Sequence, residues 1–149
     1  MKKNNDKMVK VGFVQKIGEG NFETETIWCQ INDENFIVDN IPFIVKRISM
    51  GDTIKAEYDS EDEMYYFEDF VKTSGNSTIR IFFNDNKFIE QTREWLSNNN
   101  CESEAFIDRG LIAVNIPKEI DYKPIKKFLD DGELNGDWSY EESCLEHEY

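Results

Sequence analysis

The sequence predicts an α+β protein whose two halves are built differently. In the first half, about residues 8–73, apolar residues recur at every second position between short turns, which is typical of strands. In the second half, about residues 76–146, two stretches with helical periodicity alternate with strand-like runs. The segment "TSGNSTIR", residues 73–80, lies where one pattern gives way to the other. Because units of about seventy residues bury little surface alone, we expect the halves to share one core.

The first half is expected to form five or six short strands. "VKVGFV" alternates apolar with other residues, and "TIWCQI" is rich in β-branched and aromatic residues. "FIVDNIPF" follows, and Pro42 requires that this strand ends there or lies at an edge, because proline cannot donate to a ladder. "TIKAEY" and "MYYFEDFV" follow the turns "SMGD" and "DSEDE". This series predicts a small antiparallel β-barrel or a strongly bent sheet.

The second half begins with a strand, "STIRIFF", and continues into a helix between residues 84 and 100. Asn84 or Asp85 can cap this helix, and a run of asparagines ends it. Its apolar or small residues follow one helical face: Phe88, Ile89, Thr92, Trp95 and Leu96. "SEAFID" and "LIAVNI" are predicted to form a hairpin turned by "RG".

A second helix is predicted over residues 121–132. Asp121 can cap it, Pro124 is tolerated in its first turn, and Gly132 can close it. A last short strand, "WSYEESCL", is expected to carry three residues on one face: Trp138, Tyr140 and Cys144. The resulting order, β-α-β-β-α-β, matches the ferredoxin-like plan.

The composition bounds the class of protein. Hydrophobic residues make up 39% and aromatic residues 13% of the 149 residues, which is enough for a folded core. No apolar run approaches the roughly 18 residues that cross a membrane. The lysine-containing N-terminus lacks the apolar segment of a signal peptide. We therefore expect a cytoplasmic protein with no membrane association.

Few residues are suited to catalysis or metal binding. The three cysteines, Cys29, Cys101 and Cys144, are odd in number and far apart, which argues against a disulfide framework or a cysteine zinc site. The single histidine, His147, lies near the C-terminus, whereas metal sites and nucleophile–histidine pairs need an imidazole held by structure. We assign no catalytic residue, metal or cofactor. We favour a non-enzymatic protein over an enzyme that uses carboxylates or a serine.

The excess of negative charge is confined to two windows. The chain has 31 acidic and 17 basic residues, for a net charge of -14. Residues 57–69 contain seven acids, residues 130–148 contain eight, and neither window contains Lys or Arg. Such a chain repels phosphates and anionic lipids. A basic protein partner is therefore expected, and a nucleic-acid or membrane partner is not.

The first window offers a candidate partner-binding surface. Here "YYF", residues 65–67, has acids on both sides. This run can be a strand with a core-facing side, or an exposed aromatic–acidic patch of the kind that anchors a basic partner. The candidate binding residues are Glu61, Asp62, Glu63, Tyr65, Glu68 and Asp69.

The junction segment offers a second candidate. Its N–H groups, hydroxyls and guanidinium could hold a phosphate or carboxylate. Anion-binding loops commonly feed a helix N-terminus, however, and this one feeds a strand. The alternative is a connector in which Gly75 supplies a free dihedral angle. The candidate anion-binding residues are Ser74, Gly75, Ser77, Thr78 and Arg80.

Three motifs resemble a bacterial family known as domain of unknown function 4265. They are "VDNIPF" at residues 38–43, the Gly51–Asp52 pair, and "SGNSTIR" at residues 74–80. The resemblance covers roughly residues 8–145 and includes a C-terminal Tyr-Glu-Glu, and Asn100 stands where the family is expected to have Gly. It implies a small stand-alone bacterial cytoplasmic protein, and it implies no activity, cofactor or catalytic residue.

The leading hypothesis is a non-enzymatic protein-binding module. Its particular form would be an immunity or inhibitor protein for a basic toxin, because such bacterial proteins are similar in size and charge. The alternative is a small domain that binds an anionic ligand, or is regulated by one, through the "SGNSTIR" loop; that alternative rests on analogy of fold. The sequence does not define an oligomeric state.

Overall fold

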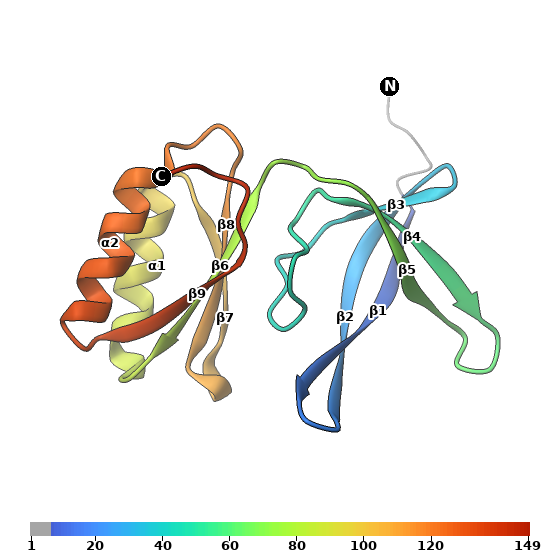
Figure 1. Cartoon of the computed structure of the whole chain (residues 1–149), viewed down its shortest axis with the longest axis horizontal. Coiled ribbons are helices and arrows are strands. Elements are labelled where there is room, and N and C mark those ends of the chain that lie inside the picture. Colours follow the sequence, from blue (N-terminus) through green and yellow to red (C-terminus); the bar gives the residue numbers. More distant parts are fainter. Residues whose placement is uncertain (1–6) are drawn as a thin grey trace. The chain divides into compact units, whose positions relative to one another are not determined.

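The computed structural model describes residues 7–149, which form two compact units divided between Ser74 and Gly75 (Figure 1). Each unit has its own cluster of buried apolar side chains. The α+β class predicted from the sequence is confirmed. The expectation that the two halves share one core stays a prediction.

The first unit is a closed barrel of five strands. These are β1 (Met8–Gly18), β2 (Asn21–Asn32), β3 (Asn35–Val38), β4 (Thr53–Asp59) and β5 (Met64–Lys72). Each strand pairs antiparallel with the next, so the predicted barrel is confirmed. The closing pair between β1 and β5 is parallel, with Val11 opposite Tyr65 and Gly12 opposite Tyr66. An up-and-down barrel with an odd number of strands requires this, because its first and last strands run the same way.

Alternation along the strands separates the inside of the barrel from its outside. The buried cluster contains Val11, Phe13, Ile27, Cys29, Phe36, Val38, Val45, Ile48 and Ile54. On the outside, the Met64 and Tyr66 side chains lie over Gly12, where a Cβ would be 2.5 Å from Met64 Cε and 2.9 Å from the Tyr66 ring. The glycine therefore lets two side chains of β5 lie flat on the outer surface of the barrel.

The segment between β3 and β4 is a long loop rather than a strand. β3 ends at Val38, four residues before Pro42, so the predicted strand "FIVDNIPF" is shorter than expected. Side-chain hydrogen bonds hold the loop instead. The Glu25 carboxylate on β2 accepts three of them, at 2.7–2.9 Å, from the consecutive N–H groups of Phe43, Ile44 and Val45.

The end of this loop is fixed by a buried carboxylate. Asp52 accepts hydrogen bonds of 2.8 Å from the N–H groups of both Ser49 and Ser74. Burial raises the pKa of Asp52 above its ordinary value, although these hydrogen bonds act in the opposite direction. Asp52 therefore ties the entrance of β4 to the segment that leaves β5.

The second unit is a four-stranded sheet whose two helices lie on one face (Figure 1). Its strands are β6 (Ser77–Phe83), β7 (Glu102–Phe106), β8 (Leu111–Ile116) and β9 (Trp138–Cys144). Its helices are α1 (Ile89–Asn98), preceded by a 3-10 turn (Asn86–Phe88), and α2 (Tyr122–Leu134); another 3-10 turn (Ile107–Arg109) joins β7 to β8. The strand order is β7-β8-β6-β9 with antiparallel neighbours, so β7 and β9 are the edges. Among residues 7–149, no helix is long and apolar enough to span a membrane.

The second helix begins at its predicted cap, whereas Asp85 caps the 3-10 turn ahead of α1, and α1 itself has no side-chain cap. Asp85 accepts a hydrogen bond from the Lys87 N–H, and Asp121 accepts one from the Lys123 N–H. The core between helices and sheet contains Ile79, Ile81, Ile89, Leu96, Cys101, Ile112, Val114, Ile116, Tyr122, Ile125, Leu129 and Trp138. Amphipathic helices on one face of the sheet therefore account for this core, as the periodicity predicted.

The prediction that Gly132 closes the second helix is wrong. α2 continues to Leu134, and the Trp138 ring lies directly against Gly132. A Cβ at this position would lie 2.0–2.6 Å from three atoms of that ring. Trp138 Nε1 also donates a hydrogen bond of 3.0 Å to the Leu129 carbonyl. The glycine serves close packing of the indole on the helix rather than helix termination.

A β-bulge corrects the predicted face of the last strand. Tyr140 lies opposite Ile81, whose side chain is in the core. A register shift between Thr78 and Ile79 places Cys144 opposite Thr78. Because directly opposite residues share a face, Cys144 and Tyr140 lie on different faces of the sheet, and the prediction that they share one is wrong.

Candidate partner-binding site

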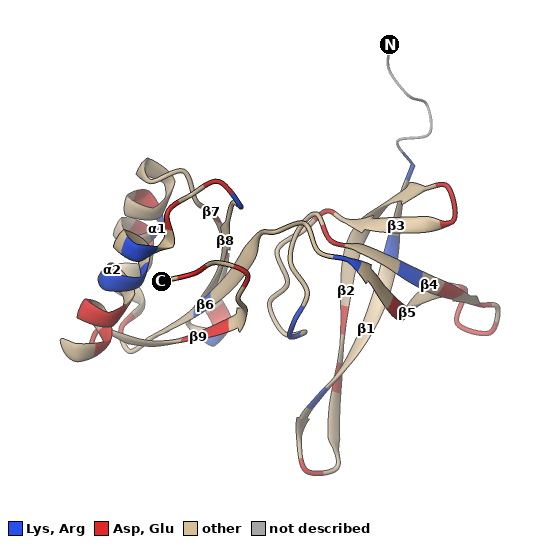
Figure 2. Ribbon diagram, turned by 45° about the horizontal axis from the view of Figure 1, so that its top comes forward, with Lys and Arg blue, Asp and Glu red and all other residues tan. Residues whose placement is uncertain are grey.

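The first acidic window forms the hairpin of β4 and β5 (Figure 2). Its acids lie on both strands and in the turn: Glu57, Asp59, Glu61, Asp62, Glu63, Glu68 and Asp69. The register places Glu57 opposite Tyr66 and Tyr58 opposite Tyr65. Acidic and aromatic side chains are therefore neighbours across the hairpin, and not only along the chain.

A groove of about 840 Å³ runs along this hairpin. Four acids, three aromatic residues and one serine line it: Glu57, Tyr58, Asp59, Ser60, Glu61, Tyr66, Phe67 and Glu68. No Lys or Arg is among these lining residues. Tyr58 is 53% exposed and Phe67 is 37% exposed, which is unusual for aromatic side chains in a core. We call this feature the acidic–aromatic groove.

The carboxylates of the hairpin are not neutralised by neighbouring cations. None of the seven acids forms an ion pair with any residue between positions 7 and 149. Asp59 accepts hydrogen bonds from the N–H groups of Glu61 and Asp62, which shapes the turn. Tyr66 donates to Asp62 at 2.7 Å, and this bond raises the pKa of Tyr66. These contacts fix the hairpin and leave its negative charge in place.

The second acidic window differs, because half of its carboxylates have partners within the second unit. They are Asp130 with Tyr140, Asp131 with Lys127, Glu141 with Arg80, and Glu142 with Tyr122 and Lys126. Burial, followed by the hydrogen bond to Asp130, raises the pKa of Tyr140 to about 12. Local pairing thus offsets part of the charge of this window, so the hairpin is the stronger candidate for an external cation.

A smaller, more apolar hollow of about 340 Å³ adjoins the groove at Tyr58, which lines both. Its other lining residues are Val9, Lys10, Trp28, Glu63, Met64 and Tyr65. Trp28 is 45% exposed, and the Lys10 ammonium lies 5.3 Å from the centroid of its ring. The exposed ring of Trp28 thus already makes a cation–π contact with a lysine of the same chain.

The six predicted partner-binding residues lie on this hairpin in different roles. Glu61 and Glu68 line the groove, and Glu63 and Tyr65 line the adjoining hollow. Asp62 bonds to Tyr66, and the Asp69 side chain accepts the N–H of the next residue, Phe70. Sequence reasoning missed the remaining lining residues of the groove. Folding the run of residues 57–69 into a hairpin about its turn would have found them, because the register brings Glu57 and Tyr58 to the aromatic run.

The predicted anion-binding residues are distributed over the end of the first unit and the start of the second. Ser74 donates its hydroxyl to the Met50 carbonyl at 3.0 Å, and Gly75 has a φ of 90°, which favours glycine. Ser77, Thr78 and Arg80 are buried on β6. Arg80 Nη1 lies 3.3 Å from Glu141 Oε1, so a carboxylate of the chain already faces this cation. Anion binding at this segment stays a prediction.

The structure brings together a serine and a histidine that no pattern in the sequence pairs. Ser77 Oγ lies 2.6 Å from His147 Nδ1, and His147 Nε2 lies 2.8 Å from the Pro117 carbonyl. Because a carbonyl only accepts, Nε2 carries a proton, and in the neutral imidazole Nδ1 then accepts from the serine hydroxyl. Ser77 is fully buried and its oxygen also accepts the Glu146 N–H at 2.8 Å. The pair therefore fastens the C-terminal segment to β6 and leaves no exposed nucleophile.

The other groups with reactive potential are enclosed. The three cysteines are free thiols in buried positions. Burial raises the pKa of Cys29 to about 12 and that of Cys101 to about 11, which keeps both thiols protonated near neutral pH. Within residues 7–149, no group of three or more His, Cys, Asp or Glu is arranged to hold a metal ion.

The fold and this surface define a small two-unit α+β protein with an acidic–aromatic groove on its barrel. Residues 25–140 match the family described as "Domain of unknown function (DUF4265)", and the chain belongs to that family, as the motifs predicted. A solved structure from Neisseria gonorrhoeae, described as that of a hypothetical protein, is 25% identical to this chain. Its TM-score is 0.81, and the similarity covers 93% of this chain and 96% of that one. No curated protein matches the chain.

Proposed function

We propose that this protein is a non-enzymatic binding module that recognises a basic protein through the acidic–aromatic groove. One observation carries the proposal: the groove combines four carboxylates and three aromatic residues, and no cation of residues 7–149 forms an ion pair with those carboxylates. An acidic surface needed only for solubility would not require exposed rings. Rings needed only for the barrel core would not require unpaired acids around them.

The groove suits the side chains of lysine and arginine. Their aliphatic stems can lie on the exposed parts of Tyr58, Tyr66 and Phe67, of which Phe67 is stacked on Phe13 on its other side, while their charged ends reach Glu57, Glu61 or Glu68. Each exposed cation–π contact stabilises a complex by about 0.5–1 kcal/mol. The field of the hairpin also raises the association rate of a basic partner and makes that rate fall with salt. Recognition of this kind needs no catalytic group.

The partner class that we propose is a small basic protein, with a basic toxin neutralised by this chain as the particular form. The support is electrostatic: of the two windows that carry the charge excess, the one at residues 57–69 has seven acids that form no ion pair with the cations of residues 7–149. We also propose a cytoplasmic location, which the three free buried thiols support. For the second unit we propose the ferredoxin-like class, supported by its element order and its strand order β7-β8-β6-β9.

The test compares capture of proteins from the native host's lysate by three forms of the chain, at low and moderate salt. The groove variant is Glu57→Lys/Glu68→Lys, and the control is Glu119→Lys/Glu133→Lys, which makes the same change in charge at exposed positions of the second unit. We expect the wild type and the control to retain one basic protein stoichiometrically. The groove variant should bind it about tenfold or more weakly. If the groove variant captures the same proteins as the wild type, the proposal is wrong.

A further inference from the structure

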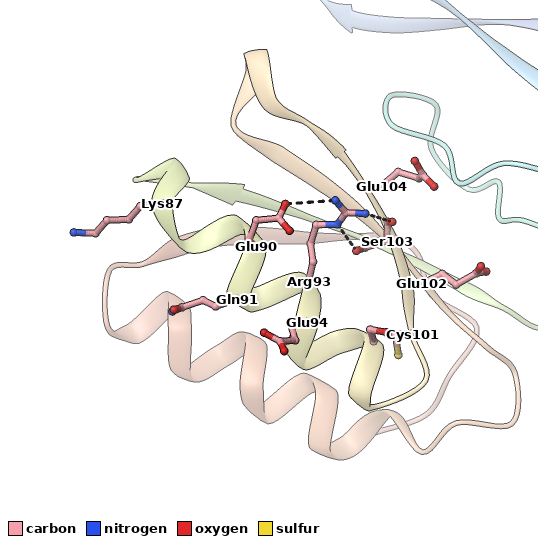
Figure 3. A pocket seen from close by; sticks show the side chains of 10 residues that line it. Lys87, Glu90, Gln91, Arg93, Glu94, Cys101, Glu102, Ser103 and Glu104 are labelled. Atoms are coloured by element: carbon pink, nitrogen blue, oxygen red, sulfur yellow. Dashed lines mark hydrogen bonds and ion pairs between the residues drawn. The ribbon is translucent and has the colours of Figure 1, made fainter.

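A second groove, of about 840 Å³, lies in the second unit between α1 and the edge strand β7 (Figure 3). Its lining comes from the exposed side of the helix and from the strand: Lys87, Glu90, Gln91, Arg93, Glu94, Ser97, Cys101, Glu102, Ser103 and Glu104. No strand among residues 7–149 pairs with β7 on the side away from β8. The groove is therefore bounded by an open sheet edge, which is a template for another strand.

The direction of the backbone groups on β7 follows from one arginine. Arg93 Nη2 on α1 donates a hydrogen bond of 2.9 Å to the Ser103 carbonyl, and Arg93 Nε donates to Ser103 Oγ at 3.0 Å. The Ser103 carbonyl thus points away from β8. In an antiparallel pair, the N–H and C=O of one residue point the same way and alternate from residue to residue. The backbone groups of Ser103 and Ala105 therefore point away from β8, those of Ser103 into the groove, while the backbone groups of Glu102 and Glu104 face β8.

The charge of the groove is negative on both of its sides. Glu90 and Glu94, one turn apart, project from α1, and Glu102 and Glu104 project from β7 (Figure 3). The cations of the groove have local partners. Arg93 is held by Ser103 and lies 3.7 Å from Glu90, and Lys87 lies 3.7 Å from Asp85. Four carboxylates and two cations thus line the groove, which leaves the open strand edge in a net negative environment.

We propose that this groove binds an extended segment of a partner protein that carries alternating lysine or arginine residues, and that the segment adds to the sheet as a strand beside β7. Its backbone would pair with the outward groups of Ser103 and Ala105. Neighbouring strands share faces, so its side chains would alternate between α1 and the opposite side of the sheet. The partner side chains that face the helix would meet Glu90 and Glu94, and the partner side chains on the other face of the sheet would meet Glu102 and Glu104.

Arg93 has a defined part in this proposal. In the free protein it covers the Ser103 carbonyl, and this protects the edge from indiscriminate pairing. A carbonyl oxygen has two lone pairs, so it can accept a strand N–H beside the guanidinium. Cys101 lies at the groove but is buried and protonated, so the site binds without covalent chemistry. The inference stands independently of the proposed function, because it concerns another unit and another mode of recognition.

The test uses a peptide of seven residues that alternates Lys and Val. A control peptide has the same sequence with every backbone nitrogen methylated, which keeps the charge and removes the strand donors. Binding to the full chain is followed by the amide signals of Ser103 and Ala105 in nuclear magnetic resonance spectra and by their hydrogen exchange. We expect the first peptide to bind and to slow exchange at both amides. The methylated peptide should do neither.

A pair of charge variants then tests the carboxylates. Glu102→Gln/Glu104→Gln should weaken binding of the Lys-Val peptide about threefold to tenfold. The control Glu119→Gln/Glu133→Gln, with equal loss of charge at exposed positions outside the groove, should leave it unchanged. Equal binding of both peptides, or equal effects of both variants, would overturn the proposal in favour of diffuse charge attraction. Absence of binding would also overturn the proposal. So would protection of the Ser103 amide from exchange that rises with protein concentration in the absence of peptide, because it would assign the edge to a second copy of the chain.

Discussion

The close contact between Gly132 and Trp138 leads to a prediction that opposes helix propensity. In an exposed helix interior, Gly132→Ala would stabilise the chain by about 1 kcal/mol. Here the new Cβ would lie 2.0–2.6 Å from the indole, so the ring must move. Overpacking of this kind costs about 1–3 kcal/mol, and loss of the Trp138–Leu129 hydrogen bond costs about 1 kcal/mol more. We therefore expect a net destabilisation of about 1–3 kcal/mol.

Urea unfolding of the full chain measures this effect. Both α-helices found among residues 7–149 belong to the second unit, so their circular dichroism signal reports on that unit. Glu133→Ala, at the next position and exposed, serves as the control and should stay within about 0.5 kcal/mol of the wild type. Trp138→Leu should remove much of the clash, so the double variant with Gly132→Ala should be more stable than the sum of the single changes predicts.

The result that would refute this reasoning is a stabilised Gly132→Ala variant. Such a result would mean that Trp138 does not lie on α2, and that helix propensity alone decides the effect at this position. Additive behaviour of the two substitutions would lead to the same conclusion, because residues in contact should couple.

Three further predictions concern single carboxylates. Glu25→Gln removes the charge of the carboxylate that accepts hydrogen bonds from residues 43–45. It should lower the free energy of unfolding by about 1.5–3 kcal/mol and speed amide exchange at residues 43–45, and unchanged exchange there would contradict the described loop. Asp121→Ala removes the cap of α2 and should lower the free energy of unfolding by about 1 kcal/mol, measured by the same urea assay. Folding raises the pKa of the Asp52 carboxyl above 3.8, so the folded chain binds the carboxyl proton more tightly than the unfolded chain does. The contribution of Asp52 to the free energy of unfolding therefore falls as pH rises from 3.8 through the pKa of the folded state. Across that pH range Asp52→Asn should lose less stability than the wild type, and parallel profiles from urea unfolding would contradict the assignment.

Local patterns predicted most of the elements and their starts. Alternation found the strands of the barrel, and the acids before each helix, Asp85 and Asp121, were recognisable because capping depends on neighbours two or three residues away. Features that depend on distant contacts were not predictable. The role of Gly132 can be predicted only if the position of the Trp138 ring is known. The parallel pair that closes the barrel depends on the number of strands, for which the sequence pattern allowed five or six.

The candidate sites were predictable to different degrees. The acidic window and its aromatic run are adjacent in sequence, so their surface could be named, although Tyr65 turns to the barrel interior and contacts Phe36 at 5.1 Å between ring centroids. The groove beside β7 could not be predicted, because it depends on which strand is left at the edge of the sheet. The contact between Ser77 and His147 joins residues 70 positions apart, and no local pattern marks it.

The measurement that tests the central claim most directly is a titration of the labelled full chain with an arginine-rich peptide, followed by nuclear magnetic resonance. A peptide alternating Arg and Gly suits this purpose, because it supplies cations and has low strand propensity. We expect the largest shifts at Tyr58, Tyr66 and Phe67, and we expect them to weaken as salt is added and to be absent in Glu57→Lys/Glu68→Lys. Shifts confined to residues 130–148, or shifts that survive in that variant, would contradict the central claim.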